Sequence, residues 1–479
     1  AQARLAQVAS ICTPELCNMS DASTNGAMAA RLELRTDAEV GAAPKPPLWR
    51  KLLATMGPGL MVCFADTDGS CLITAAESGS QWRYKLLSLQ AILIPTLYFA
   101  QELTVRLALT KGKGLTAVVR DEAGPKWAWA IGIPLLLDSF LALISEIVVI
   151  GQTINACWGI PSLVTNSVVA LSLIALAIGA NYSVAEKVGL VMGAMQVLFF
   201  ATMFVSGPSM SEIGQDIGSI PIKEGGFVKL VTANIGAVIM PWMLAYQQSA
   251  LCEKGIGQDL KEHLLIERVD TAVGSFLTQG VMAAMLITVA ARPRFRGQDI
   301  DTIDDMLPIF EEVVGNATAA KIFLTFAIVG ACIVAAIVVS LCGAWTLEGA
   351  MGHATVPRRA VAADDEGVLG RAARNVRARP SFYAAYILTC CVAWFLSVAT
   401  PDFANSLTGV WTQFINGILM PPITITLWYM CAYRVPEDYR LGPCLRWSLA
   451  AVFGVCIAFC LLSIPIAIED SFFPQSSPS

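Results

Sequence analysis

Long apolar segments alternate with short polar ones over most of the chain. Eleven of them are long enough for a helix of about 20 residues, the length that crosses the hydrocarbon core of a bilayer. Their centres lie near residues 67, 95, 140, 171, 197, 241, 280, 335, 391, 418 and 456. The pattern therefore predicts an all-α integral membrane protein with eleven transmembrane helices.

The first and the sixth apolar segments contain residues that interrupt helices. The first begins with Gly57-Pro58-Gly59 and has Gly69 and Ser70 near its middle, and glycine and serine are poorer helix formers than alanine. The sixth contains Met240-Pro241 at mid-span. Because proline has no backbone N–H, the carbonyl of Ala237, four residues earlier, is left free. Both segments are therefore predicted to be broken helices.

The positions of these two breaks suggest an internal symmetry. Broken helices at corresponding places in two halves are typical of transporters that are built from inverted repeats and bind their substrate near the bilayer midplane. We therefore expect two inverted five-helix repeats, with helices 1 and 6 broken, followed by an eleventh helix. No direct sequence repeat supports this symmetry, which rests on the two breaks alone.

Composition and charge agree with a membrane protein and suggest its orientation. The chain is 55% hydrophobic and 14% charged, whereas a soluble chain averages about 25% charged residues. Most of the 32 Lys and Arg residues fall on the cytoplasmic side if the N-terminus is placed there. The protein is therefore expected to be multi-pass in the cell membrane, with a cytoplasmic N-terminus and an extracellular C-terminus. The arginines between residues 371 and 379 fit this loop signal, so no nucleic-acid partner is expected.

The hydrophobic pattern and the local composition divide the chain into three regions. Residues 1–48 are rich in Ala, Ser, Thr, Asn and Pro and are predicted to form a disordered cytoplasmic tail. Residues 49–470 are predicted to form the eleven-helix transporter domain, and residues 471–479 an extracellular tail. Membrane lipid and a transported ion are the expected partners. No bound cofactor and no obligate protein partner are expected.

The first segment carries the most informative side chains, Asp66 and Asp68. A carboxylate in mid-membrane costs roughly 2.5 to 3.5 kcal/mol on insertion scales, so such residues are usually functional. We expect Asp68 to be a metal ligand. Asp66 either contacts the ion, caps the broken helix or bonds to a neighbouring helix. Glu77, two turns later, is either a charge close to the site or the edge of an aqueous vestibule.

The stretch from Gly57 to Leu87, which contains "FADTDGSCLITAAES", resembles the first helix of the NRAMP family of divalent-metal transporters, where the motif is Asp-Pro-Gly-Asn. Further similarities are "LTKGKGL" from Leu109, "GAVIMP" from Gly236 and "LCGAWTLEG" from Leu341. They extend the resemblance over most of the chain. The resemblance implies the LeuT-type fold, with ten core helices plus an eleventh, and alternating access around a metal site.

The resemblance also implies a set of ligands. Cys71 stands where the family has an asparagine, and Gly69 and Ser70 replace its Pro-Gly. The four implied metal ligands are the Asp68 carboxylate, the Cys71 side chain, the Ala237 carbonyl and the Met240 sulfur.

Proton coupling is not expected from this sequence. Trp242 replaces the histidine that the family associates with proton movement, and a tryptophan cannot titrate, so it is a gate or a packing residue. Glu146 stands near an acidic proton acceptor of the family, but a second acidic residue one turn later is missing. Both histidines of the chain fall in predicted cytoplasmic loops. Gln413, in the tenth helix with Asn416, is a candidate for closing the site.

Other buried acidic residues have two interpretations. Asp138, Glu146 and Glu102 either line a water path or pair with polar partners between helices.

The replaced histidine and the missing second acidic residue make the chain resemble the divergent NRAMP-related magnesium transporters. The first hypothesis is therefore Mg²⁺ transport, with Mn²⁺ as a second ion. Mg²⁺ prefers oxygen ligands and retains waters, whereas Met240 and Cys71 are soft donors that favour transition metals. The alternatives are a proton-coupled Mn²⁺/Fe²⁺ transporter and a sodium-coupled solute symporter. An enzyme is not expected, because no histidine is predicted within the membrane.

Overall fold

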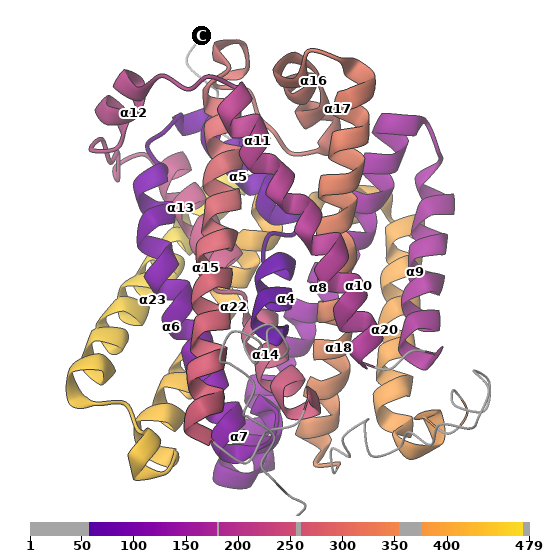
Figure 1. Ribbon diagram of the computed structural model, residues 1–479, viewed down its shortest axis with the longest axis vertical. Helices are drawn as coiled ribbons and strands as arrows, with labels where there is room; N and C mark the ends of the chain where they lie inside the picture. Colours follow the sequence, from indigo (N-terminus) through magenta and orange to yellow (C-terminus); the bar gives the residue numbers. More distant parts are fainter. Residues whose placement is uncertain (1–56, 180–181, 255–259, 354–372, 374, 473–479) are drawn as a thin grey trace, which may run out of the picture. The chain divides into compact units, whose positions relative to one another are not determined.

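Every regular element that the computed structural model describes is a helix. The described residues are 57–179, 182–254, 260–353, 373 and 375–472 (Figure 1). The predicted tails, residues 1–48 and 471–479, lie outside them except for residues 471 and 472.

The sequence predicts eleven crossings. The predicted first one corresponds to two shorter helices, α4 (Pro58–Ala65) and α5 (Gly69–Trp82). Ten further segments are long and apolar enough to span a membrane. Their helices are α6 (Leu87–Lys111), α8 (Pro125–Trp158), α9 (Ser162–Gly179), α10 (Tyr182–Gly193) with α11 (Leu198–Val205), α13 (Gly225–Val238) with α14 (Pro241–Lys254), α15 (Leu260–Ala290), α17 (Ala317–Leu324) with α18 (Gly330–Met351), α20 (Pro380–Ala399), α22 (Val410–Tyr429) and α23 (Pro443–Phe472).

Shorter helices connect several of these crossings. They are α7 (Leu115–Ala123), α12 (Met210–Asp216), α16 (Ile303–Val314) and α21 (Pro401–Ser406).

The broken helices lie in the interior of the bundle. In the sixth crossing, 94% of the most apolar window is buried, compared with 22% in the fourth and 28% in the eleventh. Figure 1 shows α4 and α5 between the other helices, with α23 and α9 at opposite edges of the view. A site at the breaks is therefore enclosed by protein and not by lipid.

The first break is stabilised by side chains from other helices. Carbonyl groups in the last turn of a helix have no partner within that helix. Here Thr278 Oγ1 donates to the Cys63 carbonyl at 2.9 Å, and Gln196 Nε2 donates to the Phe64 carbonyl at 2.6 Å. At the other side of the break, Asp68 caps α5. The unwound residues are therefore anchored to the fifth and seventh crossings.

The second break follows from Pro241, as predicted. α13 ends at Val238 and α14 begins at Pro241. The Ala237 carbonyl, which cannot pair with Pro241, accepts from the Cys71 thiol, with Sγ and O 3.4 Å apart. The two breaks therefore touch each other.

A close backbone approach holds α13 against α22. A Cβ atom added to Gly236 would overlap the Gln413 carbonyl oxygen and lie 2.6 Å from the Gly417 nitrogen. Small residues allow helices to approach closely in membranes, where van der Waals packing drives association. Gly236 therefore fixes the distance between the sixth and tenth crossings.

Ion pairs tie the helices together away from the breaks. Glu102 Oε1 lies 2.5 Å from Arg106 Nη2 on its own helix and 2.6 Å from Arg268 Nη2 on α15. Of the two interpretations of Glu102, pairing is the one that the structure supports.

Candidate metal centre

Asp68 lies at the start of α5, in the first break. Its Oδ1 accepts from the backbone N–H of Cys71 at 2.7 Å, which is an N-cap bond. Gln413 Nε2 on α22 donates to the same oxygen at 3.3 Å. The side chain is only 1% exposed. Asp68 therefore presents a buried carboxylate at the positive end of a helix.

The structure brings three of the four predicted ligands into direct contact. Cys71 receives the Asp68 cap through its N–H and donates through its thiol to the Ala237 carbonyl. Met240 lies three residues further on, inside the second break, and is fully buried. The predicted donors therefore converge at the two breaks, although the Ala237 oxygen is occupied by the Cys71 thiol.

Two further buried carboxylates lie near Asp68. Asp66, the C-cap of α4, is fully buried. Glu146 on α8 is also fully buried and faces Asp68, the Gly69 amide and Cys332. In the part of the chain that the structure describes, neither carboxylate forms a hydrogen bond. Because an unpaired buried charge is costly, both groups suit a site that receives a cation.

Gly69 and Ser70 connect the first break to α8 and α18. A Cβ atom on Gly69 would lie 2.6 Å from Val149 Cγ1 and 2.7 Å from Cys332 Sγ, so only glycine fits. The Ser70 hydroxyl lies 2.5 Å from that of Ser145 on α8. Both residues therefore position the break and do not themselves offer a free ligand.

Trp242 is completely buried at the start of α14. Its backbone N–H donates to Asp138 Oδ2 at 2.7 Å, and its carbonyl accepts from the Cys342 thiol at 3.2 Å. The indole nitrogen has no partner among the described residues. The packing interpretation of this residue is the one that its burial supports.

Glu77 lies apart from the breaks, two turns further along α5. Its Oε2 accepts from the Ile300 backbone N–H at 2.6 Å. It also lines a cavity of about 370 Å³, together with Asp299, Asp301 and Lys229. The vestibule interpretation of Glu77 therefore fits its position better than direct contact with an ion at Asp68.

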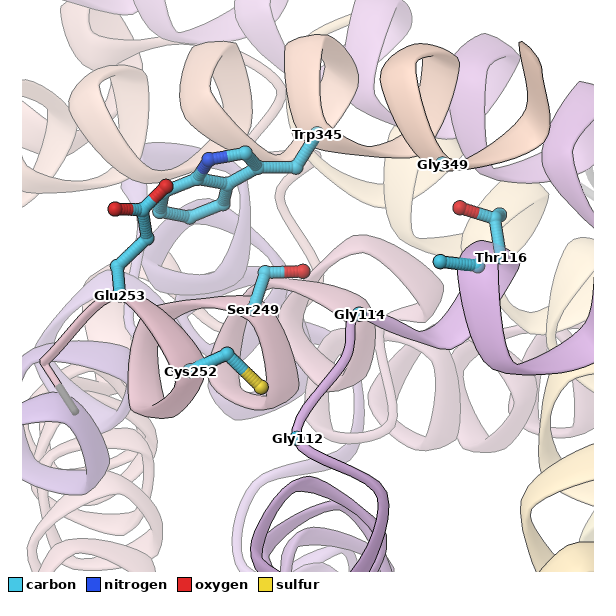
Figure 2. Close-up of a pocket in the computed structure, with 9 residues that line it drawn as sticks. Gly112, Gly114, Thr116, Ser249, Cys252, Glu253, Trp345 and Gly349 are labelled. Atoms are coloured by element: carbon cyan, nitrogen blue, oxygen red, sulfur yellow. The ribbon is translucent and has the colours of Figure 1, made fainter. Parts of the chain in front are cut away.

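A second, smaller cavity lies between α14, α18 and the start of α7 (Figure 2). It has a volume of about 50 Å³, which leaves room for a few water molecules. Figure 2 shows Ser249, Cys252 and Glu253 on one side and Trp345 on the other. Its lining residues include none of the predicted metal ligands.

The donor set is sparse by the standards of a resident metal site. In residues 57–472, as far as the structure describes them, no three His, Cys, Asp or Glu side chains gather closely enough to hold a metal. Carbonyl, thiol and thioether groups supply the other predicted donors. A dication that keeps several waters and takes one or two carboxylates does not need such a cluster.

Sequence reasoning missed several groups that shape the site. It left Asp138 without a defined partner, and it did not single out Thr278, Gln196 or Cys332. These residues lie on helices that meet the breaks only in three dimensions. The one available signal was a polar residue inside an apolar helix, which does not indicate what it contacts.

Comparison with known proteins agrees with the fold. The profile of the family described as "Natural resistance-associated macrophage protein-like", or Nramp, matches residues 59–464. The divalent metal cation transporter MntH of Ralstonia nicotianae is 27% identical over 300 residues. That alignment covers 59% of this chain and 66% of the relative.

Two solved structures resemble the fold. A manganese transporter of Eremococcus coleocola has a TM-score of 0.70 at 16% identity, with 92% of each chain covered. A nucleobase-cation-symport-1 family transporter in a closed conformation has a TM-score of 0.53 at 16% identity, with 88% of this chain and 94% of that chain covered. At these identities the similarity concerns the fold alone.

The fold and the paired breaks define an all-α, multi-pass membrane protein of the LeuT type. The profile match covers most of the chain, and the chain belongs to the Nramp family. Family membership places it among membrane transporters and not among enzymes.

Proposed function

We propose that this protein carries a divalent metal ion across the cell membrane by alternating access. The observation that carries the proposal is the buried Asp68 carboxylate at the junction of two broken helices, next to the Cys71 thiol and the Ala237 carbonyl. Relatives described as divalent metal cation transporters support the same ion class. The proposed orientation has the N-terminus in the cytoplasm and the C-terminus outside.

We propose Mn²⁺ as the main ion and Mg²⁺ as a second one, which reverses the order suggested by the sequence. The relatives named above are described as divalent metal cation transporter MntH, and a solved structure of similar fold is described as a manganese transporter. The site chemistry agrees, because the sulfurs of Cys71 and Met240 favour a transition metal over Mg²⁺. Mg²⁺, as the second ion, would bind Asp68 through retained waters.

Uncoupled transport remains a prediction based on Trp242, which cannot carry a proton. Asp66 and Glu146 are buried carboxyl groups close to the site, and either of them is a route for protons if coupling exists. The sodium-coupled solute symporter is less well supported, because an organic anion favours a carboxylate-free pocket at the half-helix ends.

Uptake into proteoliposomes tests the proposal. Purified protein is reconstituted with an internal metal-sensitive dye and an internal pH dye, and Mn²⁺ and Mg²⁺ are added separately. We expect saturable Mn²⁺ entry in the wild type. The Asp68→Ala variant should lose at least about tenfold in rate, or about 1.4 kcal/mol of stabilisation.

The control variant is Asp121→Asn, which removes an exposed carboxylate that pairs with Lys113. It should transport like the wild type. Absence of flux of either ion in the wild type would refute divalent transport. Wild-type flux in Asp68→Ala would instead refute the site. Acidification during Mn²⁺ entry would refute uncoupled transport.

A further inference from the structure

A continuous run of polar side chains joins the two helix breaks. Gln413 contacts Asp68 Oδ1 at 3.3 Å through one amide atom and Asn416 at 2.9 Å through the other. The remaining amide atom of Asn416 lies 2.7 Å from Asp138 Oδ1. Asp138 Oδ2 accepts from the Trp242 N–H at 2.7 Å, and the four side chains are at most 1% exposed. We call Asp68, Gln413, Asn416 and Asp138 the relay.

The relay can run in two directions. Each amide has one oxygen that accepts and one nitrogen that donates. In the first direction, Gln413 donates to Asp68 and Asn416 donates to Gln413, so the Asn416 oxygen faces Asp138. In the second direction, Asn416 donates to Asp138 and Gln413 donates to Asn416, so the Gln413 oxygen faces Asp68. An ionised carboxylate only accepts, so the amides satisfy one end of the relay at a time.

We propose that the relay transmits ion occupancy at Asp68 to the first turn of α14. This inference rests on the proposed function. A dication at Asp68 compensates the carboxylate charge and replaces the Gln413 amide as its partner. Both amides then turn, and Asn416 donates to Asp138. Asp138 is therefore a positioning residue of transport and not a ligand.

The position of Asp138 explains why this transmission affects the transport cycle. The first N–H groups of α14 have no partner within their own helix, and Asp138 supplies one for Trp242 from α8. The helix dipole adds to this attraction, because its positive end faces the carboxylate. When the ion site is empty, the Asn416 oxygen faces the Asp138 carboxylate. The repulsion between them weakens the hydrogen bond of Asp138 to the Trp242 N–H. With an ion bound, α14 is held firmly against α8.

Two variants cut or lock the relay without changing the Asp68 side chain. Asn416→Leu has a similar shape but removes both polar atoms. Asp138→Asn keeps an oxygen for the Trp242 N–H, but its nitrogen donates permanently to Asn416, which locks the relay in the first direction. The control is Thr424→Val, because Thr424 is a buried polar residue of the same helix that bonds to carbonyls of its own helix.

The experiment compares Mn²⁺ binding by titration calorimetry with Mn²⁺ uptake in proteoliposomes. For Asn416→Leu we expect the Kd to stay within about threefold of the wild type, while the maximal uptake rate falls at least tenfold. Asp138→Asn should lower uptake as far and also weaken binding, because a relay held in the direction of the empty site opposes ion binding. Thr424→Val should match the wild type in both measurements. In Asn416→Leu, a merely structural role would lower binding and uptake together.

The outcomes separate the relay from the proposed function. Normal uptake by Asn416→Leu and Asp138→Asn would overturn the relay alone, and so would parallel losses of binding and uptake in Asn416→Leu. Failure of wild-type protein to bind or transport Mn²⁺ would overturn the proposed function, and the relay with it.

Discussion

The buried carboxylates around the first break differ in their partners. Asp68 accepts two hydrogen bonds, whereas Asp66 and Glu146 have none in the described residues. Burial without a partner makes a charge expensive. The two unpaired groups therefore suit the cation that we propose to bind at Asp68.

Met240 is the residue that should decide between ions. Its thioether is a soft donor inside the second break, and soft donors favour Mn²⁺ over Mg²⁺. We expect Met240→Ala to lower the ratio of Mn²⁺ to Mg²⁺ uptake by at least about fivefold, which is about 1 kcal/mol of discrimination. Competition between the two ions in proteoliposomes measures this ratio. The inert control is Met210→Ala, since Met210 lies exposed on α12. An unchanged ratio would mean that the Met240 sulfur does not reach the ion.

At the residue scale, sequence reasoning predicted which candidate ligands lie together better than it predicted the residues that support them. Asp68, Cys71 and Ala237 were predicted and lie together, because each belongs to a break with a visible sequence signal. Asp138 had no such signal, since its contacts come from helices more than 100 residues away along the chain. One sequence does not reveal such pairings.

At the scale of elements, the ten long apolar helices and both breaks were predictable. Glycine and proline interrupt helices for local reasons, and apolar length marks a crossing regardless of its neighbours. The π-helical turn Thr325–Val329 in the eighth crossing was not predicted. This turn packs against α8 and α5, and the local sequence does not reveal those contacts.

The contact between α13 and α22 is the element-scale feature that is easiest to test. Gly236→Ala places a methyl group against the Gln413 carbonyl and the Gly417 nitrogen, which are backbone atoms that cannot rotate away. We expect overpacking to cost about 1 to 3 kcal/mol. The midpoint of thermal unfolding in detergent should fall by several degrees.

Gly454→Ala is the matched control for this substitution. Gly454 lies in the membrane helix α23, and no atom lies within 4 Å of its added Cβ. Its unfolding midpoint should stay the same or rise slightly, because alanine is the better helix former. Equal midpoints for the two variants would show that α13 and α22 are less tightly apposed than the structure indicates.

At the scale of the whole molecule, buried ion pairs link crossings that are distant in sequence. Glu102 joins α6 to α15 through Arg268, and Arg379 pairs with both Glu348 and Glu253. Removing one member of a buried pair leaves an uncompensated charge, which is usually more destabilising than removing both. These pairs therefore restrain how the helices move during transport.

Because removing one partner of a buried ion pair costs more than removing both, a second substitution should restore stability. Glu102→Ala leaves the buried Arg106 without its carboxylate partner and should destabilise the protein by about 3 to 5 kcal/mol. The double variant Glu102→Leu, Arg106→Met should recover most of that loss in a thermal unfolding assay. By contrast, Asp121→Ala breaks an exposed pair with Lys113 and should change little. If the double variant is as unstable as the single one, the contacts of Arg106 with neighbouring backbone matter more than its charge.

The burial of Asp68 and Met240, each at most 1% exposed, also limits how fast charge can cross the membrane. On the proposed function, an ion at this depth is shielded from both solutions, and α4, α5, α13 and α14 must shift before it leaves. We therefore expect each protein molecule to release ions one turnover at a time. A planar bilayer containing this protein should carry a small, smooth current without the unitary steps of an open pore.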